Sequence, residues 1–236
     1  MLMEQTNKIG FGILCFGDEK YFRGTIRKLN NLMELGYRCY VLTDNPEFFY
    51  PKYSPFLLNV IDYKKEIKSY HDKILLVKEI LVETDVAIIV DADMKYSADF
   101  KVLKKLKNYN FKEGISYLEN LSNHKIGASR IGEMSLMLKN DWKMYFAHVN
   151  SKIDNLMEME TIWEYFLVFK KRDYKEFYKN YEKLQIIKEY CDVLENKNIV
   201  GAGEGVTISV SCGLSNTPLQ KDVELYNNLK EMIIYE

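Results

Sequence analysis

Residues 86–90, Val-Ala-Ile-Ile-Val, contain no polar side chain, and four of the five are β-branched. A run of this kind predicts a strand that is buried on both faces, as at the centre of a parallel sheet. Two carboxylates follow directly, because the next three residues are Asp91, Ala92 and Asp93. A fold for this chain must therefore bury the strand and leave two acidic groups at its carboxyl end.

Strand-like and helix-like patterns alternate through the first 106 residues. We expect strands over residues 9–16, 38–42 and 56–61, and helices over residues 21–35, 71–83 and 98–106. This order predicts an α/β fold with a mostly parallel, Rossmann-like sheet and helices on both faces. Ligands of such sheets bind beyond the carboxyl ends of the strands, where Phe16, Asp44 and Asp91 lie in this chain.

The second half of the chain has weaker patterns. Short apolar runs predict strands within residues 117–138 and a late strand within residues 199–214. Helices are expected over residues 141–148, 160–169, 174–191 and 222–234. Because no internal repeat and no Pro-rich linker interrupts the sequence, we predict a single domain over residues 1–236.

The charge and the cysteines exclude several classes of protein. The chain has 33 basic and 34 acidic residues, whereas a protein that coats nucleic acid usually has a basic excess, so no nucleic-acid partner is expected. No run of about 18 apolar residues predicts a transmembrane segment, and residues 1–8 do not resemble a signal peptide. We expect a cytoplasmic protein, with peripheral docking at a membrane surface left open. The four cysteines form no Cys-x-x-Cys pair, so a zinc site is not expected, and Cys15 and Cys39 are predicted to be buried thiols.

The pair Asp91 and Asp93 suits a hard cation. Like charges this close repel each other, and a divalent ion such as Mn²⁺ or Mg²⁺ removes that cost through oxygen ligands. The same ion binds a diphosphate and stabilises it as a leaving group. The alternative is a solvated loop that happens to carry two acidic residues. We favour the metal site because the acids directly follow a buried strand.

Residues 85–96, Asp-Val-Ala-Ile-Ile-Val-Asp-Ala-Asp-Met-Lys-Tyr, resemble the Asp-x-Asp-Met strand end of glycosyltransferase family six, which includes the blood-group A and B transferases. Family eight shares a similar motif. The resemblance implies a GT-A fold, in which Asp91 and Asp93 bind the metal and Asp91 also contacts the nucleotide. It further implies that residues 1–110 bind the nucleotide and residues 111–236 serve the donor sugar and the acceptor.

Two further segments are similar to the same family. Residues 16–21, Phe-Gly-Asp-Glu-Lys-Tyr, resemble the turn that contacts the base and ribose, which assigns Phe16, Gly17 and Tyr21 to the nucleotide. Residues 37–46 resemble the family's second strand and its Thr-Asp turn, which adds Asp44. Lys73 or His71 stands where the family has an arginine that reaches the donor phosphates.

The catalytic carboxylate is assigned by a looser match. Met159-Glu160-Thr161, before a segment expected to be helical, resembles the family's Asp-Glu-Ser. By this resemblance Glu160 is the nucleophile or stabilises the oxocarbenium-like transition state, with Glu158 and Glu164 as rivals. Gly127-Ala128 is similar to a Gly-Ala of the donor-sugar pocket. The family's Trp-His-Asp is replaced by Leu156-Met157-Glu158-Met159, which leaves the donor sugar open.

The expected function is transfer of a hexose from a UDP-sugar (UDP-Gal, UDP-GalNAc or UDP-Glc) to a hydroxyl of a glycan or glycolipid acceptor, with retention and with Mn²⁺ or Mg²⁺. Three alternatives remain. One is an inverting GT-A transferase with Glu158 or Glu160 as base. Another is a haloacid-dehalogenase-like phosphatase, which also has Asp-x-Asp after a strand. The third is a nucleotide-sugar or glycan-binding module without catalysis.

Overall fold

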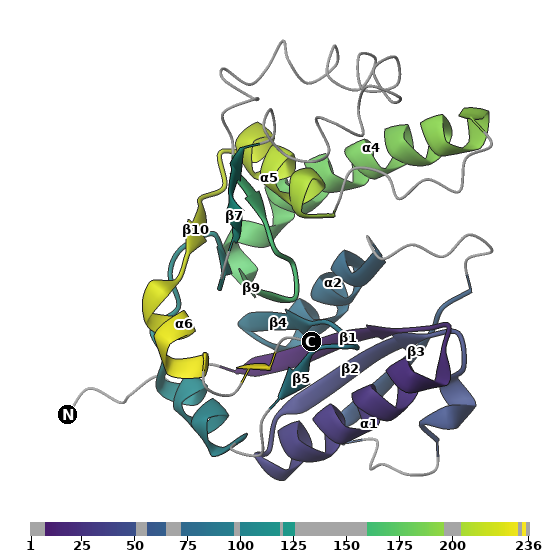
Figure 1. The fold of residues 1–236 in the computed structure, drawn as a ribbon, viewed down its shortest axis with the longest axis vertical. Coiled ribbons are helices and arrows are strands. Elements are labelled where there is room, and N and C mark those ends of the chain that lie inside the picture. The colour runs from purple at the N-terminus through teal and green to yellow at the C-terminus, as the bar shows by residue number, and fades with distance from the viewer. Residues whose placement is uncertain are drawn as a thin grey trace. The chain divides into compact units, whose positions relative to one another are not determined.

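The computed structural model describes residues 8–50, 56–64, 72–96, 100–118, 120–125, 160–195, 204–230 and 233–234. Its main sheet has seven strands in the order β10-β6-β9-β4-β1-β2-β3 (Figure 1). The predicted α/β class, with a mostly parallel sheet flanked by helices, is confirmed. The chain divides into two compact units, one of Met1–Lys112, Tyr165–Lys171 and Asp222–Glu236, the other of Glu113–Glu164 and Arg172–Lys221.

Five strands of the main sheet belong to the first unit. They are β1 (Ile9–Cys15), β2 (Arg38–Thr43), β3 (Leu58–Asp62), β4 (Val86–Val90) and β9 (Phe166–Lys170). The first four are parallel where they pair, and β9 runs antiparallel to β4. Cys15 pairs with Thr43, and Gly12 pairs with Ile89. Strands β1, β2 and β4 therefore end at the same edge, as the sequence predicts.

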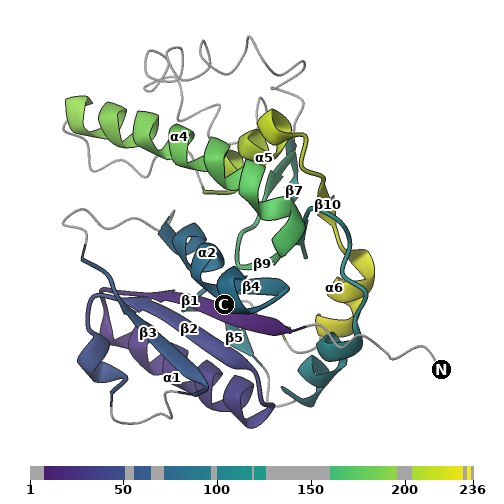
Figure 2. The same ribbon diagram turned by 180° about the vertical axis from the view of Figure 1, so that it is seen from behind.

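Helices α1 (Glu19–Glu34) and α2 (Lys73–Glu83) cover opposite faces of this sheet (Figures 1 and 2). The face toward α2 carries two glycines of β1. A Cβ atom on Gly10 would lie 2.5 Å from Ile80 Cγ2, and one on Gly12 would lie 2.8 Å from Ile80 Cδ1. The glycines thus allow α2 to pack unusually close to β1. Successive strand residues point to opposite faces of a sheet. The odd-numbered residues of β1, which include Cys15, therefore point to the face that α1 covers.

The remaining elements of the first unit are short. They are the 3₁₀ helices η1 (Pro46–Phe48) and η3 (Phe100–Asn108), strands β5 (Lys95–Tyr96) and β11 (Ile233–Ile234), and helix α6 (Val223–Leu229). The prediction of one helix over residues 222–234 is wrong in its second half. Asp222 caps α6 through the Leu225 N–H at 3.1 Å, the helix ends at Leu229, and β11 pairs antiparallel with β5.

The described residues of the second unit form two strand pairs and two helices. Strands β6 (Ile115–Tyr117) and β10 (Leu219–Lys221) are parallel, and β7 (Asn120–Lys125) pairs antiparallel with β8 (Glu160–Ile162). The helices are α4 (Lys171–Glu195) and α5 (Glu204–Ser215). Along the start of α4, Tyr174, Phe177 and Tyr181 form a series of tilted ring contacts, with centroids 6.3 Å and 5.5 Å apart.

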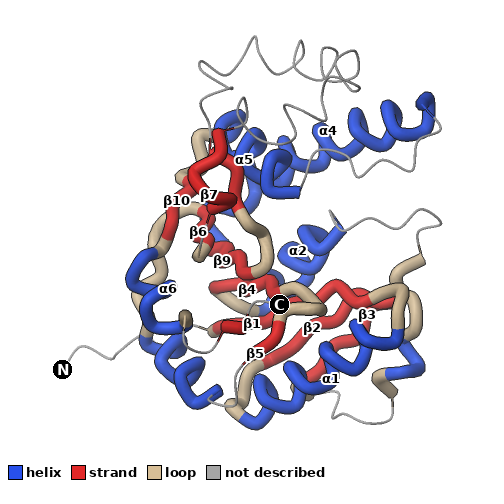
Figure 3. The backbone as a smooth tube through the Cα atoms, viewed as in Figure 1, coloured by secondary structure: helices blue, strands red, loops and turns tan. Residues whose placement is uncertain are grey.

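The predicted helix over residues 160–169 is wrong, because this segment forms β8 and β9 (Figure 3). Phe166, Leu167, Val168 and Phe169 are all buried, which a strand in the interior of a sheet allows. Their partner is β4, far away in sequence, with Val90 opposite Phe166. The aromatic spacing that suggested a helix is overridden by this long-range pairing.

The predicted late strand within residues 199–214 is also wrong, because residues 204–215 form α5. The alternation of Ser or Thr with apolar residues looks like a strand pattern. In the helix, the hydroxyl groups donate to carbonyls one turn earlier: Ser209 to Gly205 at 2.8 Å and Ser211 to Thr207 at 2.7 Å. These bonds satisfy the hydroxyl groups within the helix and permit its burial.

Three cysteines with described side chains, Cys15, Cys39 and Cys212, are buried thiols without a disulfide. This agrees with the prediction for Cys15 and Cys39. In the part of the chain that the structure describes, every helix is too short or too polar to span a lipid bilayer. Residues 126–159 are not described, so the strands expected beyond residue 125 and the helix expected over residues 141–148 lie outside the described residues.

Candidate functional site

The candidate site lies in the first unit, where β1, β2 and β4 end. Phe16 follows β1, Asp44 follows β2, and Asp91 follows β4. The Asp91 N–H donates to the Tyr165 carbonyl at 3.1 Å, which ties the start of the Asp-x-Asp turn to the residue just before β9. The turn therefore begins on rigid, paired backbone.

Lys73, the first residue of α2, binds the Asp91 carboxylate. Its Nζ lies 2.5 Å from Asp91 Oδ1, and its side chain is 5% exposed against 29% for Asp91. An ammonium group buried this far needs a charged or hydrogen-bonding partner, because losing its hydration is costly. The predicted phosphate-contacting lysine is thus brought to the Asp-x-Asp motif. His71, the alternative, lies outside the described residues.

Tyr63 and Asp72 form a buried contact next to Lys73, at the corner that Lys73, Asp91 and Asp93 form at the end of β4. The hydroxyl of Tyr63, just after β3, donates to Asp72 Oδ2, and both side chains are buried. Asp72 immediately precedes Lys73 and is the N-cap residue of α2. The ring of Tyr63 also packs on Phe16, with centroids 5.8 Å apart. A continuous series of contacts therefore runs from Phe16 through Tyr63 and Asp72 to the start of α2.

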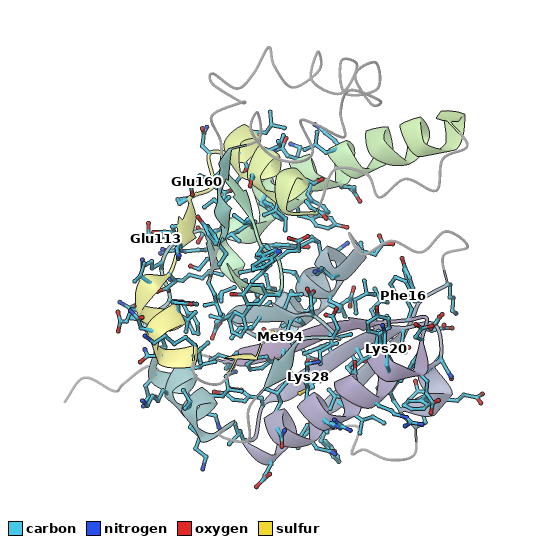
Figure 4. The ribbon with its side chains drawn as sticks, in the orientation of Figure 1. Phe16, Lys20, Lys28, Met94, Glu113 and Glu160 are labelled. Atoms are coloured by element: carbon cyan, nitrogen blue, oxygen red, sulfur yellow. The ribbon has the colours of Figure 1, made fainter. Side chains whose placement is uncertain are left out.

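Lys28 of α1 reaches the same corner from the opposite face of the sheet. Its Nζ donates to the Ala92 carbonyl, and the residue is 3% exposed. Burial lowers the pKa of Lys28 to about 8, while the negative charges of Asp93 and Asp91 act in the opposite direction. The ammonium form therefore predominates at pH 7. Lys28 and Met94, which follows the Asp-x-Asp turn, are labelled in Figure 4.

Gly24 makes the approach of α1 possible. A Cβ atom at this position would lie 2.9 Å from the Ala92 carbonyl oxygen and 3.8 Å from Lys28 Nζ. Gly24 and Lys28 are four residues apart, so they share one face of the helix. Any larger residue at position 24 would push the helix away from the Asp-x-Asp turn.

Asp91 and Asp93 are the predicted metal ligands. Asp93 is exposed and Asp91 is half-buried, so a cation can reach both from solvent. Among the residues with described positions, no group of three or more His, Cys, Asp and Glu side chains is arranged to hold a metal. Two carboxylates suit a hard cation that takes its other ligands from phosphate oxygens and water, as Mg²⁺ commonly does.

The predicted base-binding residues surround the turn between β1 and α1. Gly17 has φ +87°, a left-handed conformation that favours glycine. The Tyr21 N–H donates to the Asp18 carbonyl at 3.0 Å, and Lys20 Nζ lies 4.8 Å from the centroid of the Tyr21 ring. Phe16, Tyr21 and Asp44 are each half-buried. Phe16 and Asp44 lie at strand ends and Tyr21 lies in the first turn of α1, and their contact with a nucleotide stays a prediction.

Glu160 lies in the second unit, on β8, and is labelled in Figure 4. It begins this strand and not the helix that was expected over residues 160–169. Tyr117 Oη donates to Glu160 Oε2 at 3.2 Å, and burial together with Glu160 raises the pKa of Tyr117 to about 12. Ser209 Oγ lies 2.8 Å from the Glu160 carbonyl oxygen and 2.8 Å from that of Gly205, so these two carbonyls share one hydroxyl donor. Glu158 and Gly127-Ala128 lie outside the described residues, and the catalytic role of Glu160 stays a prediction.

No protein-family model and no curated protein matches the sequence. Three similar solved structures are all glycosyltransferases. A mannosyltransferase from Pyrobaculum calidifontis, in complex with GDP-Man and Mn²⁺, is 12% identical with a TM-score of 0.47, over 92% of this chain and 56% of that chain. The glycosyltransferase GlyE from Streptococcus pneumoniae, in its apo form, is 13% identical with a TM-score of 0.41, over 92% and 46%. Mouse xyloside xylosyltransferase 1, also apo, is 9% identical with a TM-score of 0.43, over 90% and 84%.

This chain spans about half the length of the first two of these proteins. The likenesses are distant and do not determine an activity, which must follow from the residues of this chain. The resemblance to families six and eight likewise stays a prediction.

Sequence reasoning missed Lys28, Gly24 and Tyr63. A signal for Lys28 exists, because it falls among the buried residues of α1, between Thr25 and Leu29. A lysine in the buried stripe of an amphipathic helix needs a partner. The identity of that partner depends on how α1 packs against β4. Tyr63 carries no such signal, because its partner Asp72 lies nine residues later in the sequence, at the start of another element, α2.

Proposed function

We propose that this chain is a nucleotide-sugar-dependent glycosyltransferase of the GT-A type, with its donor site at the Asp91–Asp93 corner. The observation that carries the proposal is the clustering of two carboxylates and two buried lysines at the end of a central strand. Lys73 binds Asp91, and Lys28 binds the Ala92 carbonyl between the two acids. Acidic and basic groups held together at a strand end suit a ligand that combines a cation with an anionic diphosphate.

The residues around this corner suit the parts of a UDP-sugar. Phe16 and Tyr21 present aromatic rings for a base, and Asp44 offers a carboxylate for ribose hydroxyl groups. The ammonium group of Lys73 can move from Asp91 to a donor phosphate over a small distance, because Asp91 and the phosphate would lie at the same strand end. Asp91 and Asp93 would hold Mn²⁺ or Mg²⁺. Such an ion, when bound, neutralises charge on the departing diphosphate.

In the proposed reaction, a hexose moves from the nucleotide to a glycan or glycolipid hydroxyl. The bond between sugar C1 and the diphosphate oxygen breaks, a bond from the acceptor oxygen to C1 forms, and the proton of the acceptor hydroxyl passes to the departing diphosphate. We assign Glu160 to the positive charge that develops at C1, with retention of configuration, and Glu158 as the rival. Residues 1–110 would bind the nucleotide and residues 111–236 the sugar and acceptor.

Turnover by substituted proteins tests the donor site. Asp91→Asn and Asp93→Asn keep the size of the side chain and remove its charge, so hydrolysis of the UDP-sugar with Mn²⁺ should fall about 100-fold or more. Asp85→Asn is the matched control, because Asp85 lies at the amino end of the same strand and accepts from the Lys8 N–H. Equal activity of all three variants would contradict the assignment. Binding of UDP without any turnover would instead favour a non-catalytic binding module.

A further inference from the structure

Lys28 is a buried cation at the Asp-x-Asp turn that the proposed reaction does not use. It is 3% exposed, it comes from α1, and it is the second lysine bound to this turn after Lys73. Its position is specified by packing, because Gly24 lets α1 approach the Ala92 carbonyl closely. A buried ion pair is often no more stable than an apolar contact, so an apolar residue at position 28 would cost the fold little. Stability of the fold alone therefore does not account for a lysine at this position.

The two lysines change the charge of the metal site. Asp91 and Asp93 carry two negative charges, and Lys28 and Lys73 carry two positive ones. Both ammonium groups are buried close to the carboxylates. Water and salt screen the electric field of a buried charge only weakly. A divalent cation that arrives alone is thus repelled by Lys28 and Lys73 as well as attracted by Asp91 and Asp93. A cation that arrives with a diphosphate brings the compensating negative charge with it.

We propose that Lys28 is a built-in counter-ion of the Asp91–Asp93 corner, which keeps the affinity for a divalent metal low until a diphosphate is present. This inference rests on the proposed donor site and concerns its regulation. The metal and the diphosphate would then bind together rather than one after the other. Lys28 acts here through the two carboxylates and the Ala92 carbonyl, so it is a positioning residue and not a catalytic one.

Equilibrium dialysis of the protein against Mn²⁺, with the metal retained by the protein measured, tests the proposal without any turnover. Lys28→Met keeps a long, unbranched side chain and removes the charge. It should bind Mn²⁺ at least about tenfold more tightly than the wild type in the absence of pyrophosphate, because one repelling charge is lost from a poorly screened site. With saturating pyrophosphate, the difference should become smaller.

Lys107→Met is the matched control. Lys107 also donates to a backbone carbonyl next to α1, that of Leu35, at 2.8 Å, but at the C-terminal end of the helix. Its replacement should leave the Mn²⁺ affinity unchanged. The tighter binding by Lys28→Met should also disappear when Asp93→Asn is added, because the extra affinity must come from this corner and not from an unrelated surface site.

An unchanged or weaker Mn²⁺ affinity of Lys28→Met, in a protein that melts as cooperatively as the wild type, overturns the proposal. If Lys28→Met does not fold, Lys28→Gln replaces it, because the amide keeps a donor for the Ala92 carbonyl. If neither variant folds, the wild type decides: Mn²⁺ binding that is as tight without pyrophosphate as with it overturns the proposal. Failure of the wild type to bind Mn²⁺ even with pyrophosphate instead contradicts the proposed metal-dependent donor site.

Discussion

The acidic groups of the two units are held in different ways. Asp91 in the first unit follows a strand that is buried on both faces, and a lysine that is 5% exposed binds its carboxylate. Glu160 in the second unit begins the three-residue strand β8, is exposed, and accepts a hydrogen bond from the neutral hydroxyl of Tyr117. The contact to Asp91 thus comes from a charged group, whereas the contact from Tyr117 to Glu160 comes from a neutral one.

This difference suggests a division of roles. A carboxylate whose charge is already paired suits binding, because its partner cation can attract a diphosphate or yield to a metal. An exposed carboxylate that accepts a hydrogen bond from a neutral hydroxyl, as Glu160 does from Tyr117, suits a positive centre that develops in a reaction. The predictions below test whether binding and chemistry separate in this way between Asp91 and Glu160.

The largest effect is expected at Glu160. Glu160→Gln should lower kcat about 100- to 1,000-fold, as expected when a group that stabilises transition-state charge is removed, and should leave the affinity for UDP with Mn²⁺ unchanged. Steady-state kinetics and calorimetry measure the two quantities. Glu176→Gln, on the exposed face of α4, is the control and should leave both unchanged. A loss of UDP affinity equal to the loss of kcat would remove the proposed division of roles.

A smaller effect is expected at Lys73, and it concerns the affinity for UDP. Lys73→Met removes the partner of Asp91 and a cation for the phosphates, and should weaken UDP binding about 10- to 100-fold, as for the loss of a hydrogen bond between charged groups. Lys78→Met, at an exposed position of the same helix, should bind UDP like the wild type. Wild-type affinity in Lys73→Met would show that the ion pair is purely structural.

Gly24→Ala tests the packing of α1 against the Asp-x-Asp turn. Alanine normally stabilises a helix relative to glycine by about 1 kcal/mol. Here its Cβ would lie 2.9 Å from the Ala92 carbonyl oxygen, so the free energy of unfolding should fall by about 1 kcal/mol instead. Asn30→Ala, on the exposed side of the same helix, should raise it slightly. Urea unfolding measures both changes, and a more stable Gly24→Ala would contradict the close approach.

The smallest effect concerns the thiols. Burial raises the pKa of Cys15 to about 11 and raises the pKa of Cys39 and of Cys212 further. At pH 8 these three groups should therefore be protonated and inaccessible to iodoacetamide until the protein unfolds. Mass spectrometry of peptides from native and urea-treated protein measures the labelling. Rapid native labelling of Cys15 would mean that the end of β1 opens to solvent.

Much of the first unit could be predicted from local pattern. The apolar runs around Phe11, Val41 and Ile88 predict strands. The spacing of the apolar residues in α1 and α2 predicts helices. The order of these segments then fixes parallel pairing and gathers the strand ends at one edge. This is why the positions of Phe16, Asp44 and Asp91 follow from sequence.

The errors arose where distant residues decide the local structure. Phe166–Lys170 forms a strand because β4 offers a partner 76 to 84 residues earlier, and no local pattern contains that information. Ser209 and Ser211 sit in a helix because their hydroxyl groups bond to its own carbonyls. The role of Lys28 depends on the packing of α1 against the turn after β4, a contact between residues 64 positions apart.

Calorimetric titration with UDP, in the presence and absence of Mn²⁺, tests the donor site most directly. The wild type and Asp85→Asn should bind UDP much more tightly with Mn²⁺ than without it, and the double variant Asp91→Asn with Asp93→Asn should show no such gain. The same Mn²⁺-dependent gain in the double variant, or no UDP binding by the wild type under either condition, would contradict the assignment of these two carboxylates to a nucleotide-sugar site.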